Sequence, residues 1–284
     1  MTVETFDCPL GGVTLHAVAM GKDKGKGPLA VLLHGITANA YVFLPLMERL
    51  AEHFRLVSID MRGHGHSSKP AAGYAAKDYA DDIEALVRHL DSGPALLIGH
   101  ALGARDAFVA GARNNGLVSG VVAIDFTPFI DEQVFVALGE RIGHGNRLFA
   151  DRDAITAALS ERYPMTPPDA IQRRVTYGYR KVEGGWRPLA EAHAMVETAN
   201  GMRETFEADF KSLKVPTLLI RGAESRFISP EVWARTKALR PDMRFVELPN
   251  ADHYAAEEIP GPIADEILSF STASSTVITS PNDT

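Results

Sequence analysis

Short apolar runs alternate with amphipathic stretches along most of the chain. Six runs are apolar at nearly every position, which is typical of parallel strands covered on both faces. They span residues 29–35, 54–60, 95–100, 118–125, 216–222 and 243–249. The stretches between them have helical spacing, and we expect helices over 42–52, 77–91, 102–113, 230–239 and 258–270. The alternation predicts an α/β fold with a mostly parallel central sheet, flanked by helices and connected by right-handed crossovers.

The alternation of strands and helices breaks between residues 130 and 208, which are helix-like and rich in arginine. We predict that 130–208 form a helical cap over the site, inserted after the strand at 118–125. Surface helices without a role in binding are the alternative. The core would then comprise 1–129 and 209–270, and the small polar residues of 271–284 predict a flexible tail.

The composition adds constraints on partners and compartment. It is 45% hydrophobic and 23% charged, as in ordinary globular proteins. The net charge of −7 argues against nucleic-acid binding but allows an anionic small-molecule substrate in a locally basic pocket. The single cysteine, Cys8, favours a reducing compartment such as the bacterial cytoplasm. We find no signal peptide, membrane span, metal-ligand spacing or phosphate-binding loop, so we expect no membrane, metal or cofactor, and oligomeric state stays open.

The sequence "IGHALGAR" (98–105) has the Gly-x-X-x-Gly spacing of a nucleophile elbow, where a strand turns sharply into a helix. The middle position, which is serine in hydrolases with this turn, is Ala101. The N–H of Leu102 would begin the helix and point at developing negative charge as one oxyanion donor. The second donor would be the N–H of Ile36, after the His-Gly pair in "LLHGITANAYVF" (32–43). Alone, each motif is a weak signal, because glycine turns are common.

The sequence "PNADHYAAEE" (249–258) puts His253 in the loop after the last predicted strand, where we expect a general base. Such a base needs a carboxylate that fixes its tautomer. The loop "GAESRFIS" has Ser225 where an aspartate is usual, with Glu224 beside it. Asp125, at the end of a buried strand, needs a partner, and we favour it over Glu224. We expect His34 and His100 to lie in the pocket wall.

Together with "IDMRGHGHSS" (59–68), these loops resemble the α/β-hydrolase superfamily. The resemblance implies an α/β-hydrolase fold with a helical cap after its sixth strand. The chain is more closely similar to the (E)-2-(acetamidomethylene)succinate hydrolases of bacterial vitamin B6 degradation, from about Pro28 to Phe270. Its most specific motifs are "HGITANAYVF" and "VVAIDFTPF". The resemblance assigns the nucleophile position to Ala101, the acid to Asp125 and the base to His253.

The substrate of this family carries an enamide and two carboxylates. The resemblance implies that Arg141, Arg162 and Tyr163 of the cap hold the carboxylates. From its place in the pocket wall, we also expect His100 in the substrate site. A guanidinium suits this role because it binds a carboxylate through two parallel hydrogen bonds. We expect most of the remaining cap arginines to be solvated: Arg147, Arg173, Arg174, Arg180 and Arg187.

Ala101 lacks the hydroxyl that this chemistry needs. By analogy with triad deletions in serine proteases, its absence costs on the order of a million-fold in turnover. Because the other groups are retained, we expect an engineered replacement of serine in a hydrolase of a small anionic amide. Two alternatives stay open. One is a cofactor-free dioxygenase that uses a His/Asp base, and the other is a non-catalytic ligand-binding homologue.

Overall fold

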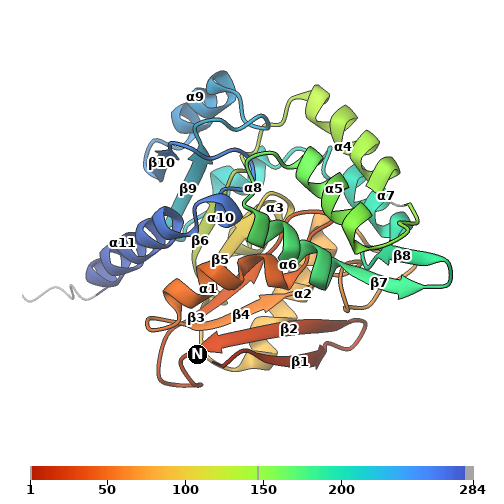
Figure 1. Cartoon of the computed structure of the whole chain (residues 1–284). Helices are drawn as coiled ribbons and strands as arrows, with labels where there is room; N and C mark the ends of the chain where they lie inside the picture. The colour runs from red at the N-terminus through yellow and green to blue at the C-terminus, as the bar shows by residue number, and fades with distance from the viewer. Residues whose placement is uncertain (1, 146, 279–284) are drawn as a thin grey trace, which may run out of the picture.

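A computed structural model describes residues 2–145 and 147–278 (Figure 1). The large sheet has eight strands in the order β1-β2-β4-β3-β5-β6-β9-β10. These are β1 (Glu4–Pro9), β2 (Thr14–Gly21), β3 (Leu29–Leu33), β4 (Arg55–Ile59), β5 (Ala95–His100), β6 (Val118–Ile124), β9 (Thr217–Gly222) and β10 (Arg244–Leu248). The pairs from β4 through β10 are parallel, and the pairs of β2 with β1 and with β4 are antiparallel. The prediction of a mostly parallel sheet is confirmed.

The helices cover both faces of the sheet. They are η1 (Ala40–Phe43), α1 (Leu44–Leu50), α2 (Ala76–Leu90), α3 (Leu102–Ala112), α4 (Glu132–Gly145), α5 (Arg152–Arg162), α6 (Pro168–Gly178), α7 (Ala192–Gly201), α8 (Glu207–Ser212), α9 (Pro230–Leu239), α10 (Ala255–Glu258) and α11 (Pro260–Ile278). Helix α11 continues through 271–278, where we expected the tail to begin, and 279–284 lie outside the described residues. No helix in the described part combines the length and apolarity that a membrane crossing requires.

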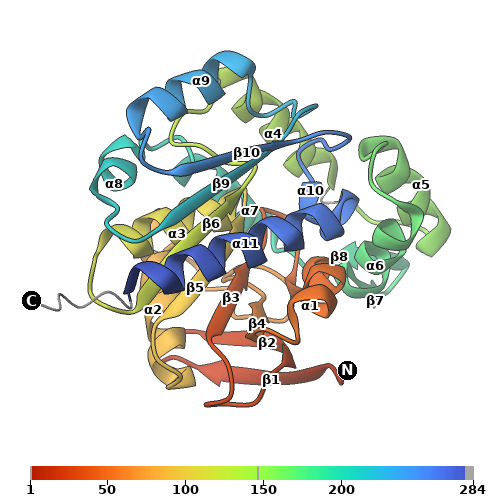
Figure 2. The same cartoon turned by 90° about the vertical axis from the view of Figure 1, so that its left-hand side faces the viewer.

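The central strands are buried on both faces because successive side chains point into different helical layers. In β3, Leu29, Val31 and Leu33 belong to the core cluster that includes α2 and α3. Ala30 and Leu32 belong to the second cluster, with α1 and α11. Figure 2 shows α11 and α1 crossing one face of the sheet, with α2 and α3 behind it. The continuous apolar runs of the sequence follow from this double coverage.

The N-terminal hairpin of β1 and β2 is absent from our sequence prediction. Exposed or half-buried residues interrupt both strands, so neither forms a continuous apolar run. The hairpin extends the sheet along β4, through the antiparallel pairing of Ala17–Gly21 with Arg55–Ile59. Edge strands with one solvated face give a weaker apolar signal than central parallel strands.

The segment between β6 and α8 contains four helices, α4 to α7, and a two-stranded hairpin of β7 (Tyr179–Val182) and β8 (Gly185–Pro188). It occupies the right-hand side of Figure 1. The sequence predicted helices here and missed the hairpin, whose turn uses Gly184 and Gly185 at positive φ. Side chains of α4 and Met202 line a cavity together with residues that follow the core strands. The segment therefore covers the carboxyl ends of those strands.

The turn from β5 into α3 depends on two glycines. A Cβ atom on Gly103 would overlap the carbonyl oxygen of Leu33 in the neighbouring strand, and one on Gly99 would overlap the backbone of Gly103. Between them, Ala101 has φ 48° and ψ −110°, a conformation that L-residues rarely adopt. Close approach of α3 to β3 thus requires the glycines, and the strained residue is held by its surroundings.

We predict that Gly103→Ala lowers the free energy of unfolding by about 3 kcal/mol, because the methyl group meets backbone that cannot move independently. Gly139→Ala is a matched control within α4, since a Cβ there meets no described atom within 4 Å. It should stabilise by about 0.5–1 kcal/mol through helix propensity. Urea denaturation measures both. Equal effects of the two substitutions would contradict the close packing of the elbow.

Candidate active site

Four chain segments, each following a parallel strand, meet at one cavity. Ile36 follows β3, Ala101 follows β5, Asp125 follows β6 and His253 follows β10. The cavity has a volume of about 450 Å³. Four of the residues singled out in the sequence therefore come together at the carboxyl edge of the sheet. This edge is where open α/β sheets bind ligands.

His253 and Asp125 form a buried hydrogen-bonded pair. His253 Nδ1 donates to Asp125 Oδ2 at 2.7 Å. Ser225 Oγ donates to the same carboxylate oxygen at 2.7 Å, and the Gly222 N–H donates to Oδ1 at 3.2 Å. Because the carboxylate accepts, Nδ1 carries the imidazole proton and Nε2 keeps a free lone pair. Ser225, where an aspartate is usual in this loop, here donates to Asp125 instead.

Glu224 does not take part in this pair. Its side chain is exposed, and its backbone N–H donates to the Ala251 carbonyl at 3.0 Å. The carboxylate that the sequence analysis favoured, Asp125, is the one that contacts His253 in the structure.

Burial sets the protonation state of His253. It lowers the pKa of His253 to about 3, and the positive charges of Arg141 and Arg174 further disfavour the imidazolium. Phe227 stacks on the ring, with centroids 3.8 Å apart, and shields it from solvent. Burial also raises the pKa of Asp125, against the opposing hydrogen bonds from Ser225 and Gly222. At neutral pH, the imidazole is neutral and can accept a proton.

The loop after β3 packs directly on the elbow. A Cβ on Gly35 would lie 2.8 Å from His100 Nδ1 and 3.5 Å from the methyl group of Ala101. Ile36 is the next residue, and Leu102 is the first residue of α3. Within the described residues, neither backbone N–H has a hydrogen-bond acceptor. Two free donors therefore flank Ala101, as stabilisation of an oxyanion requires.

Two histidines expected in the pocket wall have structural contacts instead. His100 Nε2 donates to the carbonyl oxygen of His253 at 2.8 Å, and the two rings lie 4.7 Å apart. His34 Nδ1 donates to the Gly35 carbonyl at 2.8 Å, and its Nε2 accepts from the Met61 N–H at 3.0 Å. Neither residue lines the two cavities of the site. His100 thus packs against His253, and its role in the substrate site stays a prediction.

A second cavity, of about 640 Å³, lies between the cap and the segment after β3. Arg141, Arg162, Tyr163 and Arg174 line it, and Arg141 also lines the cavity around Ala101. The three cap residues predicted to bind substrate are therefore side by side. We call this second space the cationic cavity and the first the catalytic cavity, and they adjoin at Arg141.

The positive charges act on the tyrosines around them. Burial raises the pKa of Tyr163, but the charges of Arg141, Arg174 and Arg162 outweigh this effect and lower it. Arg141 Nη1 donates to Tyr254 Oη at 2.6 Å, and Tyr254 directly follows the base in the chain. The site therefore has an electrostatic preference for anions despite the negative charge of the whole protein.

Comparison with known proteins agrees with this geometry. The model of the alpha/beta hydrolase family matches residues 30–266. The chain belongs to the alpha/beta hydrolase family. It is 45% identical over 261 residues to the 2-(acetamidomethylene)succinate hydrolase of Mesorhizobium japonicum (strain LMG 29417 / CECT 9101 / MAFF 303099), covering 92% of each chain.

Solved structures extend the comparison. A crystal structure of E-2-(acetamidomethylene)succinate hydrolase matches with a TM-score of 0.92 and 43% identity, over 95% of this chain and 100% of that one. The thioesterase domain from the curacin biosynthetic pathway has a TM-score of 0.82 at 20% identity, over 94% of this chain and 100% of that one. The second similarity concerns the fold alone.

This alpha/beta hydrolase buries an arginine that the sequence analysis placed among the solvated ones. Arg174 of α6 is 8% exposed. Its Nε donates to Glu257 Oε2 at 3.0 Å, and Nη2 pairs with Oε1. Its guanidinium also lies 4.7 Å from the Tyr163 ring and 4.9 Å from the Tyr254 ring. No local pattern distinguishes Arg174 from Arg173, because its partner lies in α10.

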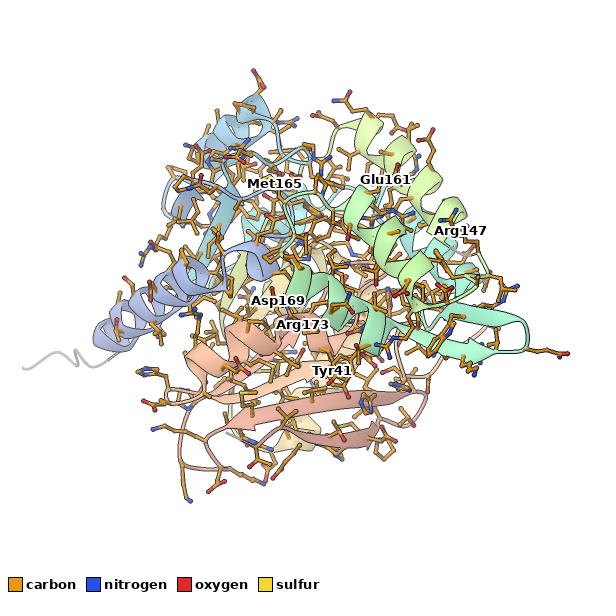
Figure 3. All side chains as sticks on the ribbon, viewed as in Figure 1. Tyr41, Arg147, Glu161, Met165, Asp169 and Arg173 are labelled. Atoms are coloured by element: carbon orange, nitrogen blue, oxygen red, sulfur yellow. The ribbon has the colours of Figure 1, made fainter. Side chains whose placement is uncertain are left out.

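The Arg174–Glu257 pair ties the cap to the segment that carries the base. Glu257 belongs to α10, which begins two residues after His253. Figure 3 labels Asp169 and Arg173 of α6 near Tyr41 of η1, and the side chain of Arg173 is only 12% exposed, so it is not solvated as expected either. Within the described residues, no group of three or more histidine, cysteine, aspartate or glutamate side chains could hold a metal ion.

We predict that Arg174→Met lowers the free energy of unfolding by about 3–5 kcal/mol, because it leaves the Glu257 carboxylate buried without its partner. Adding Glu257→Leu should recover much of this loss. Arg187→Met, on the exposed face of β8, should change stability by less than about 0.5 kcal/mol. Denaturant unfolding of the three variants measures this. A similar small effect at Arg174 would contradict its role as an anchor of the cap.

Proposed function

We propose that this alpha/beta hydrolase is built to cleave the amide C–N bond of (E)-2-(acetamidomethylene)succinate or a close analogue, as in vitamin B6 degradation. The observation that carries this proposal is the arrangement around Ala101: a neutral His253 paired with Asp125, two free N–H donors and an adjoining cationic cavity. The similarity to hydrolases of this compound supports the same substrate. Ala101 stands at the nucleophile position and leaves the present chain without the attacking hydroxyl.

The mechanism requires serine at position 101, as in Ala101→Ser. His253 Nε2 takes the hydroxyl proton as Oγ forms a bond to the acyl carbon. The carbonyl oxygen gains the negative charge, and the N–H groups of Ile36 and Leu102 stabilise it. The C–N bond then breaks, and His253 returns its proton to the leaving nitrogen. Water, activated by His253, attacks the acyl-enzyme and releases acetate and free enzyme.

The cationic cavity would hold the two carboxylates of the substrate. Arg141 is at the junction of the cavities, so it can reach a carboxylate while the amide lies at Ala101. Arg162 and Tyr163 line the same cationic cavity. Bidentate hydrogen bonds from guanidinium fix the orientation of a planar carboxylate, and the orientation of the amide follows from it.

A second candidate function follows from the completeness of the His253–Asp125 pair in the absence of a nucleophile. A neutral, oriented imidazole can remove a proton from an acidic heterocycle, whose carbanion then reacts with oxygen without a cofactor. Restoring the hydroxyl would not change such a reaction. A ligand-binding protein without turnover would likewise be indifferent to the hydroxyl.

We predict that Ala101→Ser creates release of acetate from (E)-2-(acetamidomethylene)succinate, at a rate on the order of a million-fold above the present chain. The matched control is Ala101→Ser with His253→Ala, which should return to background because the base is missing. Acetate is measured by an enzyme-coupled assay. Oxygen uptake with a hydroxyquinolone, unaffected by residue 101, would instead support the dioxygenase. Binding without any turnover in Ala101→Ser would support a ligand-binding protein.

We also predict the pH dependence of the Ala101→Ser enzyme. The base must be unprotonated, and burial lowers the pKa of His253 to about 3, so the imidazole stays neutral as the pH falls from 7. Stopped assays should therefore give a nearly constant kcat/KM between pH 7 and about pH 5, above the titration of the substrate carboxylates. A decline centred near pH 6.5, the value of an unperturbed histidine, would contradict the burial of the base.

A further inference from the structure

The catalytic cavity has an apolar part that the proposed chemistry does not use. Away from Ala101 and His253, it is lined mainly by hydrocarbon side chains. These include Phe126, Phe129, Leu138, Met202, Phe227 and Ile228. We call this part the apolar pocket. It is formed jointly by the segment after β6, the cap and the segment after β9.

Asp125 and Thr127, next to the apolar pocket, already have partners, whereas the buried Nε of Arg141 has none among the described residues. Asp125 accepts from His253, Ser225 and Gly222. Thr127 Oγ1 donates to the Phe129 carbonyl at 2.6 Å. Arg141 lies at the boundary with the cationic cavity. Away from Arg141, a ligand group in the apolar pocket therefore contacts mainly hydrocarbon.

The contrast between the two cavities orients the substrate. An amide at Ala101 has an acyl side and a nitrogen side, and the nitrogen side of the proposed substrate bears the carboxylates. Placing a carboxylate among Phe126, Leu138 and Met202 would cost its hydration without compensation. The carboxylates therefore enter the cationic cavity, and the acyl chain enters the apolar pocket.

An acetyl group presents only one methyl group to the apolar pocket, whose hydrocarbon wall is built by side chains from three segments of the chain. We propose that the apolar pocket accepts acyl chains longer than acetyl, so that the substrate class is N-acyl enamides of a dicarboxylic acid with apolar acyl groups. This inference rests on the proposed function, because it takes the orientation of the amide from it. It adds the specificity for the acyl chain.

The expected gain in affinity with a longer acyl chain comes from the burial of its hydrocarbon in the apolar pocket. Each methylene transferred from water into the pocket should tighten binding about three- to fourfold, the equivalent of about 0.8 kcal/mol. A hydroxyl group on the acyl chain should cancel this gain in affinity, because the hydrocarbon side chains of the apolar pocket would bury it without a hydrogen-bond partner.

Binding can be measured on the chain as it exists, since Ala101 prevents cleavage. Isothermal titration calorimetry would compare the N-acetyl, N-propionyl, N-butyryl and N-hydroxyacetyl derivatives of (E)-2-(aminomethylene)succinate. The Kd should fall about three- to fourfold with each methylene. The hydroxyacetyl derivative, which is nearly isosteric with propionyl, should bind more weakly than propionyl.

A pair of variants tests whether the preference for longer acyl chains arises in the apolar pocket. Met202 lines the pocket and is 6% exposed, and Met202→Phe should fill space and remove the preference for longer chains. Met165 is 37% exposed on the outer side of the cap, between α5 and α6 (Figure 3), and Met165→Phe should retain the preference. If Met202→Phe fails to fold, Leu138→Phe tests the same wall.

The two proposals fail in different ways. If the acetyl derivative binds and the propionyl and butyryl derivatives bind equally or more weakly, the inference about the pocket is overturned and the proposed function stands. If no derivative binds, the proposed function is overturned together with the inference. A preference for longer chains that survives both Met202→Phe and Leu138→Phe would also overturn the inference, since it would arise elsewhere.

Discussion

The hydrogen bond from His253 to Asp125 joins the ends of β10 and β6 at the centre of the site. Both side chains are buried and therefore need polar partners, and this bond supplies one to each. Asp125 also has a backbone φ of 50°, a strained conformation for a residue other than glycine, and the surrounding structure must hold it in place. Ser225 and Gly222 complete the hydrogen bonding of the carboxylate. With Nδ1 fixed in this way, Nε2 is the ring nitrogen left for chemistry, and the rest of the site is arranged around it.

The cap divides the space in front of that nitrogen by charge. Three arginines lie in the otherwise largely apolar wall of the cationic cavity, and only one of them, Arg141, also reaches the mainly hydrocarbon wall of the catalytic cavity. Arg174 contributes to this division and also ties α6 to Glu257, close in the chain to the base. One cap residue therefore links the position of the cationic cavity to that of the imidazole. A substrate with charge at one end and hydrocarbon at the other can be oriented by this arrangement alone.

Much of this fold was predictable because its signals are local. Buried parallel strands give continuous apolar runs, and the elbow requires glycines at fixed spacing, so 95–105 were interpretable without a structure. Asp125 was predictable because a carboxylate that ends a buried strand needs a partner. The β1–β2 hairpin was not, since its strands are only partly buried. The contacts of Arg174, His100 and His34 could not be predicted. Their partners are backbone groups or residues far away in the chain, and no local sequence pattern indicates such contacts.

The central claim is that an amide carbonyl binds between the N–H groups of Ile36 and Leu102, with its carbon facing residue 101. A crystal structure of the present Ala101 chain soaked with (E)-2-(acetamidomethylene)succinate tests this most directly. We predict that the carbonyl oxygen lies about 3 Å from both nitrogens, with the acyl carbon toward the Ala101 methyl group. A bound ligand whose carbonyl points away from these two N–H groups, with its amide outside the catalytic cavity, would contradict the account.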